Sequence, residues 1–415
     1  MSLAGEQKLI ACHECDHLYR VSPVPEGGRA CCTQCGAVLY RNISNSIDRT
    51  LALFLSALVL MIIANSFPFI SLEISGRVET NALVAGAWEM HKAGMGELGL
   101  LVFLTSVFFP LLVIVGMIYL LLPIRLGFQP PAKGAVYRII KALIPWSLVG
   151  VFLLGIVKLL DLADVIPGIS MFALAGLMVV YAAARTNWEP SSIWPHTSAE
   201  NLQLKGNAKT AYEHGLIHCH TCGLLVPQST LKDHSHASCP RCDSPLHFRK
   251  NNSLARTWAL VLTAAVLIIP ANVYPIMTVI RFGQGEPDTI YSGITHLIES
   301  GMWGLALIVF FASIVVPVLK LIVLTLLLIT VQKRSTWRVK DRTLLYRATE
   351  VVGAWSMVDI FLVALLSALV SLDALATIRP GIGAVYFACV VVITMIAAHT
   401  FDPRLIWDNS GGQND

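Results

Sequence analysis

The amino-acid sequence predicts an all-α polytopic membrane protein made of two tandem parallel repeats, each a zinc ribbon followed by four transmembrane helices. Three observations predict it: a scarcity of charge, a series of long apolar runs and an internal repeat. Of the 415 residues, 55% are hydrophobic and only 13% are charged, whereas soluble domains contain about 25% charged residues. Lipid is therefore the expected solvent for most of the surface.

The long apolar runs indicate transmembrane helices, because a segment needs about 20 mostly apolar residues to span the hydrocarbon core of a bilayer. Four runs of this kind lie in each half of the chain, and charged side chains interrupt only three of the eight. These runs predict eight transmembrane helices, at residues 50–72, 98–124, 139–160, 165–184, 257–280, 300–332, 351–372 and 380–398.

The loops between the runs indicate the orientation. The loops after the second and sixth runs are rich in lysine and arginine, and the loops on the opposite side are acidic. Because an excess of Lys and Arg marks cytoplasmic loops, both termini and the linker over residues 186–218 are expected in the cytosol. The net charge of +4 is then a topology signal, and no nucleic-acid partner is expected. The polar, cysteine-rich N-terminus has no signal peptide, so the first run should act as an uncleaved anchor.

The internal repeat divides the chain. Cys12 falls on Cys219, a shift of 207 residues, and the same shift places Asn65 on Asn272 and Pro110 on Pro317. Each copy has an even number of predicted helices, so the copies should share one orientation and be related by an axis along the membrane normal. The predicted divisions are a first ribbon at 1–48, a helical unit at 49–186, a linker with the second ribbon at 187–252, a helical unit at 253–404 and a tail at 405–415.

Each repeat begins with two C-x2-C turns separated by sixteen residues, which is the spacing of a zinc ribbon. Four thiolates close the coordination shell of a tetrahedral Zn²⁺, so two structural zinc ions are predicted. Two disulfides per ribbon are the alternative, and a cytosolic location opposes them; iron is a weaker rival for the metal. The histidines beside these turns, including His218 and His220, are expected to be exposed and not to be ligands. The predicted metal ligands are Cys12, Cys15, Cys32, Cys35, Cys219, Cys222, Cys239 and Cys242.

Ionisable side chains within the apolar runs are the next candidates, because charge inside a bilayer is costly and usually functional. Lys320 and Asp359 lie near the middle of the sixth and seventh runs, and Ser356 lies one turn before the aspartate. We expect Lys320 and Asp359 to pair within the helices. Lys158 and Asp161 lie near the outer end of the third run, where a lysine can also reach the interface. The sequence contains no Walker loop, nucleophile elbow or HExxH motif, so no enzyme activity is predicted.

Three segments carry a family resemblance: IVVPVLK at 314–320, WSMVDIF at 355–361 and HTFDPRLIWD at 399–408. With the paired ribbons and the duplication, the chain resembles the paraquat-inducible protein A family. The resemblance implies a subunit of the inner membrane of Gram-negative bacteria, with tetraspanin-like four-helix units. It also implies a periplasmic MCE-domain partner and transport of membrane lipids between the inner and outer membranes, with ion movement as a possible energy source. The alternative function is a metal- or redox-responsive membrane sensor.

Overall fold

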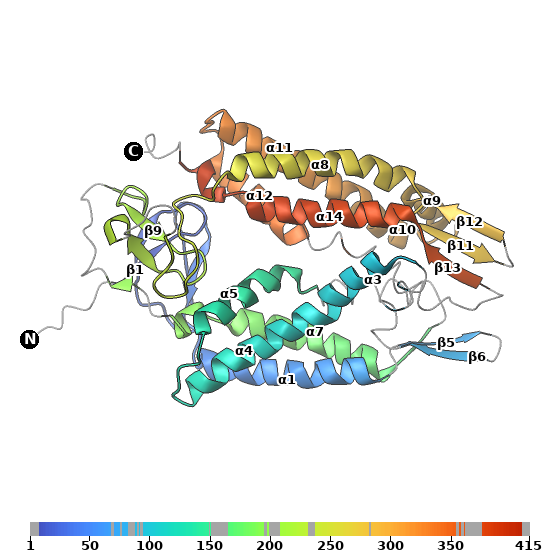
Figure 1. The fold of residues 1–415 in the computed structure, drawn as a ribbon, viewed down its shortest axis with the longest axis horizontal. Coiled ribbons are helices and arrows are strands. Elements are labelled where there is room, and N and C mark those ends of the chain that lie inside the picture. Colours follow the sequence, from blue (N-terminus) through green and yellow to red (C-terminus); the bar gives the residue numbers. More distant parts are fainter. Residues whose placement is uncertain are drawn as a thin grey trace, which may run out of the picture.

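The structure is a computed structural model, and it is mostly helical (Figure 1). Long helices form two groups that lie one above the other in this view. Small β-sheets lie at one end of both groups, and the cysteine ribbons lie at the other end. The structure describes residues 8–67, 70–74, 77–81, 88, 91, 94–148, 150, 165–194, 197–198, 208–230, 237–281, 284–353, 357, 361 and 376–408.

The first helix group comes from the first half of the chain. In it, α1 packs against α7 and α4, and the hydroxyl of Ser46 at the start of α1 donates to the carbonyl of Asn187 at the end of α7, 2.8 Å away. The helices of this group are α1 (Ser46–Ser66), α3 (Gly96–Phe103), α4 (Phe109–Arg125), α5 (Lys133–Leu143) and α7 (Ile169–Asn187).

The second helix group repeats much of this order. Here α8 packs against α14 and α11, and Ser253 at the start of α8 donates to the carbonyl of Thr400 at the end of α14, 2.9 Å away. Buried side chains of α3 and α14 belong to one apolar core, which joins the two groups. The helices of this group are α8 (Ser253–Val273), α9 (Ile290–Glu299), α10 (Trp303–Phe310), α11 (Val316–Gln332), α12 (Val339–Gly353) and α14 (Ile382–Thr400).

Six helices of the described residues are long and apolar enough to cross a membrane: Ser46–Ser66, Gly96–Arg125, Ile169–Asn187, Ser253–Val273, Ala306–Gln332 and Ile382–Thr400. The structure differs from the prediction at the third span, residues 139–160. α5 ends at Leu143, and a 3-10 turn follows at Ile144–Trp146, because Pro145 has no N–H to continue the helix. Much of this run, and most of the seventh run at 351–372, lies outside the described residues, so the count of eight stays a prediction.

The helices that open each group end earlier than predicted, and strands follow them. α1 ends at Ser66 and α8 at Val273, and the residues after them, Phe67 and Tyr274, are extended. A proline follows each of these two residues in the sequence and disfavours helical backbone before it. The all-α prediction is therefore wrong at this end of the molecule, where two antiparallel sheets form.

The two sheets have the same layout. In the order β6-β5-β7, the strands are Arg77–Asn81, Ile70–Ile74 and Val165–Pro167; in the order β12-β11-β13, they are Gln284–Asp288, Met277–Arg281 and Ala376–Pro380. Ile70 lies opposite Pro167, and Met277 lies opposite Pro380. Each sheet therefore joins the strand after the first helix of its group to the strand before the last helix.

A π-helical turn precedes a proline in both groups. The turn Leu104–Phe108 comes before Pro110, and the turn Phe311–Val315 comes before Pro317. Within these turns the hydroxyls of Ser106 and Ser313 donate to the carbonyls four residues earlier, at 2.6 and 2.7 Å. Pro110 and Pro317 have no N–H to donate within the helix. In the first group, the carbonyl of Thr105 inside the π turn accepts the N–H of Leu148 instead, at 3.1 Å, as neighbouring segments allow in membrane helices.

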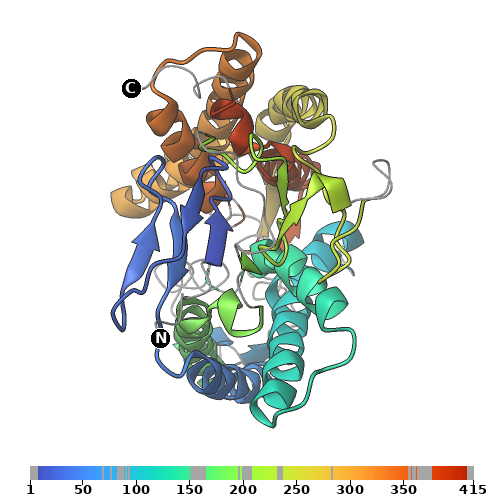
Figure 2. The same ribbon diagram turned by 90° about the vertical axis from the view of Figure 1, so that its left-hand side faces the viewer.

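The two ribbons lie side by side at the other end of the helices (Figures 1 and 2). Five buried side chains form the small core between the ribbons: Leu9, Ala11, Ala211, Leu216 and Leu225. The strands of the first ribbon are β1 (Lys8–Ala11), β2 (Leu18–Arg20), β3 (Arg29–Cys31) and β4 (Val38–Arg41), and β8 (Thr197–Ser198) pairs with β1. The strands of the second ribbon are β9 (Leu216–His218) and β10 (Leu225–Pro227).

Candidate metal centres and a buried lysine

The four C-x2-C turns share one backbone form. In each, the N–H of the residue after the second cysteine donates to the carbonyl of the first cysteine, at 2.8–3.0 Å. That residue has a positive φ in every turn: 63° at Asp16, 75° at Gly36, 74° at Gly223 and 55° at Asp243. Glycine and aspartate are among the residues that tolerate this conformation best. The sequence therefore makes each turn locally, and each turn presents two sulfurs on one side.

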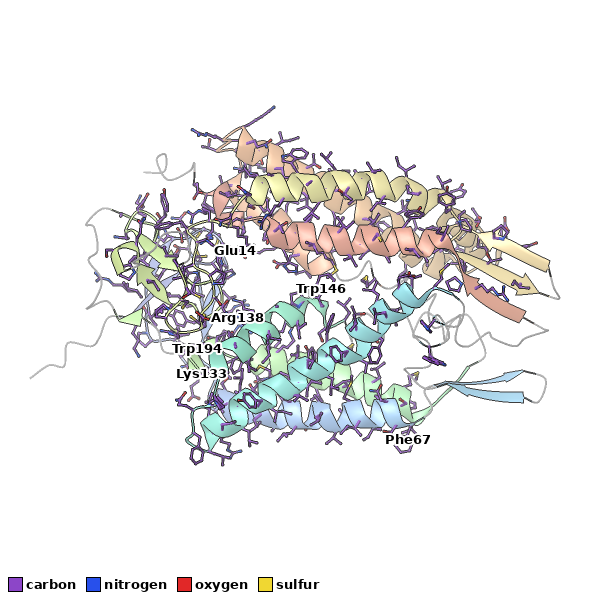
Figure 3. All side chains as sticks on the ribbon, viewed as in Figure 1. Glu14, Phe67, Lys133, Arg138, Trp146 and Trp194 are labelled. Atoms are coloured by element: carbon purple, nitrogen blue, oxygen red, sulfur yellow. The ribbon has the colours of Figure 1, made fainter. Side chains whose placement is uncertain are left out.

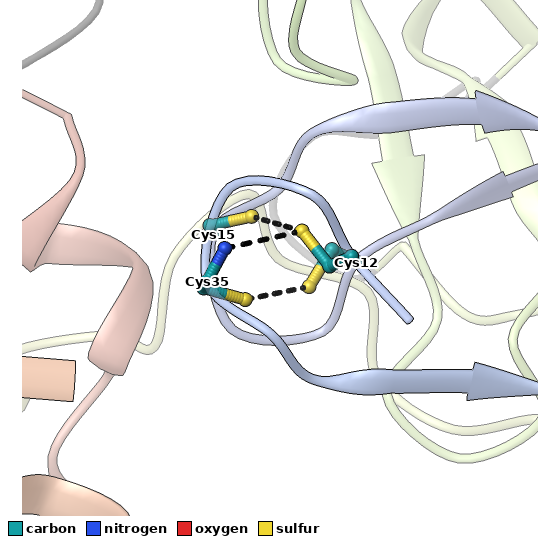
Figure 4. Close-up of side chains that lie close together, drawn as sticks. Cys12, Cys15 and Cys35 are labelled. Atoms are coloured by element: carbon teal, nitrogen blue, oxygen red, sulfur yellow. Dashed lines mark hydrogen bonds between the residues drawn. The ribbon is translucent and has the colours of Figure 1, made fainter. Parts of the chain in front are cut away.

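The turns bring the eight cysteines into two clusters of four. Figure 4 shows Cys12, Cys15 and Cys35 of the first cluster. The Sγ atoms lie 3.5 Å apart for Cys12 and Cys35 and 3.4 Å apart for Cys15 and Cys32. In the second cluster, Cys219 and Cys242 are 3.5 Å apart, and Cys222 and Cys239 are 3.6 Å apart. A tetrahedron with zinc–sulfur distances of about 2.3 Å has edges of about 3.8 Å. Both clusters therefore fit a metal ion held by four sulfurs, and neither leaves a position for a substrate.

The pKa values of the thiols diverge within each cluster, because hydrogen bonds among the cysteines raise the pKa of some, such as Cys15 and Cys222, and lower the pKa of others. Hydrogen bonds from Cys12 and Cys15 hold the pKa of Cys32 well below the usual thiol range. Hydrogen bonds from Cys219 and Cys222 lower the pKa of Cys239 to about 2. Because the thiolate is the form that binds metal, each cluster contains a sulfur that is ready to bind without losing a further proton.

The Cys239–Cys242 turn of the second ribbon packs on α5 of the first helix group. Arg138 of α5 donates to the carbonyl of Asp243 at 2.6 Å. Gly134 lies so close that a Cβ atom there would be 2.8 Å from the Cα of Cys242. Trp194 completes the contact, with the charged ends of Lys133 and Arg241 lying 4.6 and 5.8 Å from its ring. Figure 3 shows Arg138, Lys133 and Trp194 together at this boundary.

The Cys32–Cys35 turn of the first ribbon packs instead on α12 of the second helix group. Arg347 of α12 donates to the carbonyl of Cys35 at 2.8 Å and forms an ion pair with Glu14. Trp407 packs against the first cysteine cluster, and its indole N–H donates to Thr343 of α12 at 3.0 Å. Each ribbon thus places one of its cysteine turns on the helices of the other half, an arrangement that we call crosswise docking.

The histidines beside the cysteines differ from the prediction. His218 is buried, with 8% of its surface exposed, because it lies in β9 between the ribbon and the helices. His220 is half-buried, and its Nε2 lies 2.8 Å from the guanidinium of Arg404. His13 is exposed, as predicted. None of the three belongs to either sulfur cluster.

Lys320 lies buried in α11, with 2% of its surface exposed. Its ammonium donates to the hydroxyl of Thr394 in α14 at 2.8 Å, and that hydroxyl donates to the carbonyl of Val391 at 2.9 Å. Gly353 at the end of α12 lies beside the lysine, and a Cβ there would make an ordinary van der Waals contact with the Nζ, at 3.5 Å. Thr394 was not among the predicted site residues, although it and Tyr386 are the two hydroxyl residues of the run 380–398.

A cavity of about 740 Å³ lies between the helix groups, close to this lysine. Its walls are apolar near Leu148, Met178 and Met395, and Gly353 belongs to them. Arg185 and Glu350 form its polar part, with His399 3.7 Å from the glutamate. Asp359, Ser356, Lys158 and Asp161, the other predicted intramembrane residues, lie outside the described residues.

Comparisons with known proteins cover nearly the whole chain. The family model of paraquat-inducible protein A matches residues 47–198 and 254–410. The intermembrane transport protein PqiA of Escherichia coli K12 is 31% identical over 97% of this chain and 96% of that protein. The lipophilic envelope-spanning tunnel protein A of the same strain is 30% identical over 96% of this chain and 90% of that protein.

A third relative comes from another bacterium. The probable intermembrane transport protein of Haemophilus influenzae is 29% identical over 96% of both chains. No solved structure matches the chain.

Proposed function

Because the chain belongs to the paraquat-inducible protein A family, we propose that it is the inner-membrane subunit of a lipid transport system. In this proposal it moves phospholipid or other lipids between the inner and outer membranes, together with a periplasmic MCE-domain partner. Relatives named as intermembrane transport proteins and as an envelope-spanning tunnel protein support transport rather than an enzymatic reaction. The six long apolar helices make the chain a multi-pass membrane protein.

We propose eight transmembrane spans in two tandem repeats, with the divisions predicted from the sequence. The parallel layouts of β5–β7 and β11–β13 support this, as do the π turns before Pro110 and Pro317. In this arrangement the third and seventh spans are residues 139–160 and 351–372, and much of both lies outside the described part.

The ribbon end of the molecule is proposed to face the cytosol, with both termini there. Exposed basic residues lie at that end: Arg125 ends α4, and Lys333 and Arg334 follow α11. Exposed acids such as Glu286 and Glu299 lie at the sheet end. This distribution follows the positive-inside rule and would place the two sheets in the periplasm, where a partner could reach them.

Two structural zinc ions are proposed for the sulfur clusters. Four thiolates suit zinc and leave it no open position, so the ions would hold the ribbons folded and take no part in transport chemistry. Iron has the same ligand preference in such a site, and elemental analysis separates the two metals.

The transport site is proposed around Lys320, and the burial of this lysine beside a cavity between the helix groups is the observation that carries the proposal. An intramembrane cation needs a counter-charge, and Asp359 is the acid proposed to supply it, with Ser356 nearby. Lys158 and Asp161 are proposed as a second charged position in the first half. Movement of a proton or a lipid headgroup past these charges would couple an ion gradient to transport.

The decisive experiment is complementation of a lipid-transport defect by Asp359→Asn, which keeps the size of the side chain and cannot ionise. Normal abundance with lost complementation is the expected result. Full complementation at normal abundance would refute a transport role for this charge. Loss of protein without a specific defect would instead indicate a structural pair.

A metal- or redox-responsive sensor is less well supported. Such a sensor needs sulfurs that release metal or oxidise reversibly, whereas seven of the eight cluster cysteines are buried and Cys35 is half-buried. Reversible metal loss in the range of cellular chelators, with a change in activity, would favour the sensor.

A further inference from the structure

A second cavity, of about 540 Å³, lies between the two ribbons and the nearby ends of α5 and α7. Its size falls within the range of small-molecule sites, about 300–1,000 Å³. The first ribbon contributes His13 and Arg41 to its walls, and the second contributes His218 and Arg241. The ribbons must lie side by side for this cavity to exist, so it is a composite site.

The cavity is strongly basic. Arg41, Lys141, Arg185 and Arg241 line it, against one acid, Glu189. Glu189 accepts the backbone N–H of Arg41 at 3.0 Å. Lys141 is used for docking, because its ammonium donates to the carbonyls of His220 and Thr221.

Three guanidinium groups therefore remain around the cavity. Arg41 donates to the carbonyl of Thr186 at 3.4 Å, and Arg241 lies over the ring of Trp194. Within the described part of the chain, neither these two nor Arg185 forms an ion pair. The three cations thus share the space with one carboxylate, that of Glu189, so the charge around the cavity is net positive.

The imidazoles add hydrogen-bonding groups. The ring of His218 lines the cavity, and its Nδ1, which is buried, has no hydrogen-bond partner in the protein. A guanidinium only donates, so the Nε2 of His220 must accept from Arg404, and its proton lies on Nδ1. The cavity therefore combines fixed positive charge with the polar imidazole rings of His13, His218 and His220.

We propose that this cavity binds a phosphate group, and that the group is the phosphodiester of a membrane lipid headgroup. Guanidinium groups match phosphate oxygens in geometry and stay charged at every physiological pH. Arg185 also lines the larger, mostly apolar cavity between the helix groups. A headgroup held among the ribbons could therefore direct its acyl chains toward that space. A soluble phosphate compound is the other source of the same chemistry.

The inference goes beyond the proposed transport function, because the site is separate from Lys320 and its occupancy can be measured without transport. The probes are dihexanoyl phosphatidylglycerol, used below its micelle concentration, and inorganic phosphate. Binding of each to the purified full-length, metal-loaded protein in detergent is followed by calorimetry. The test variant combines Arg41→Gln with Arg241→Gln. The control combines Arg20→Gln with Arg29→Gln, which removes the same charge from exposed positions of the first ribbon.

We expect the lipid to bind the wild type and the test variant to bind it about tenfold more weakly, as expected when charge-assisted hydrogen bonds are lost. The control should stay within about twofold. Arg185→Gln is the second variant, used if the double variant loses metal by elemental analysis, and it should weaken binding in the same way.

The two probes distinguish the sources. Binding of the lipid alone supports a headgroup. The alternative outcome is that inorganic phosphate binds, competes with the lipid and loses affinity in the same variants. That outcome supports a phosphate site filled from solution. Equal weakening in the test and control variants, or no binding of either probe to the wild type, overturns the site whether or not transport is lost.

Discussion

Arg347 of α12 and Glu14 of the first ribbon form an ion pair between residues 333 positions apart in the sequence, with Nε–oxygen distances of 2.8 and 2.7 Å. The same guanidinium donates to the carbonyl of Cys35. Arg138 lies opposite Arg347 in the sequence repeat at a shift of 209 residues, two more than near the cysteines, the same shift that aligns Trp146 with Trp355. It makes the matching contact with the carbonyl of Asp243 in the second ribbon. Crosswise docking therefore rests on two equivalent arginines.

Arg347→Ala should loosen the first ribbon and leave the second intact. The change strands Glu14, whose side chain is only 10% exposed, and removes hydrogen bonds to charged groups worth about 1–3 kcal/mol. We expect faster metal release to a chelator from one of the two sites, measured by stopped-flow absorbance. Arg138→Ala should speed release from the other site, and Arg338→Ala, at an exposed position, should change neither rate.

The Arg347–Glu14 pair should also make docking of the first ribbon sensitive to acid. Burial alone would raise the pKa of Glu14, but hydrogen bonds from His13 and Arg347 outweigh it and lower the pKa below 4.5. A carboxylate with a depressed native pKa stabilises the fold fully above its unfolded pKa and loses that effect as pH falls through the native value. Chelator release should therefore accelerate below about pH 4.5 in the wild type, and this pH step should shrink in Glu14→Gln.

Each cysteine cluster should hold one metal ion independently. Elemental analysis of the purified protein should give two zinc ions per chain, one for each cluster. Cys219→Ser should remove one ion and lower the abundance of the protein, because structural zinc contributes directly to folding free energy. Intact disulfides with no metal would contradict the assignment.

The proposed topology can be tested with impermeant thiol reagents. A cysteine at the exposed Ser300 should react in intact spheroplasts, and one at the exposed Thr336 should react only after lysis. Cys31 and Cys389 are exposed and must first be replaced by serine. The opposite labelling pattern would invert the topology.

Thr394→Val should impair transport more than it impairs folding, if Lys320 works in transport. The substitution keeps the shape of the side chain and removes the 2.8 Å hydrogen bond to the ammonium. Lys320→Met is the matching substitution at the other end of this hydrogen bond. If the lysine pairs with a buried acid, stranding that acid costs about 3–5 kcal/mol, so this variant should fall in abundance unless Asp359→Asn accompanies it. Comparing complementation with the amount of each variant protein separates a loss of transport from a loss of folding.

The sheet end is the expected docking surface for a periplasmic partner. Photo-crosslinkers at Trp88 and Tyr291, which are 59% and 70% exposed, should capture an MCE-domain protein. The adjacent Ile290 is buried, at 5% exposure, and serves as the control position. If neither exposed position gives a crosslink, the proposal that the sheet end is the docking surface loses its support.

The cysteine clusters could be predicted from the sequence because their geometry is local. Each C-x2-C turn needs only one following residue with positive φ, and Asp16, Gly36, Gly223 and Asp243 supply it. The predicted ends of α1 and α8 were wrong because apolar, β-branched residues such as those of Met277–Arg281 suit both a membrane helix and a strand.

Contacts between distant segments could not be predicted in this way. No periodicity shows that Arg347 faces the first ribbon, because that depends on how two helix groups and two ribbons pack. Thr394 lies in an uncharged run, so only the position of Lys320 in space reveals its role. His218 was expected to be exposed beside its cysteine turn, yet it is buried where the second ribbon meets the helices.

Crosswise docking also sets an order of assembly during synthesis. The second ribbon emerges from the ribosome when its docking helix already exists, since Asp243 follows Arg138 by 105 residues. The first ribbon emerges 312 residues before Arg347. At about 5–20 residues per second, it waits about 15–60 s for its binding surface. Until β8 and the second ribbon emerge and cover it, only its metal and its own short strands hold it folded, so zinc supply in the cell should limit how much of the nascent chain reaches the docked state.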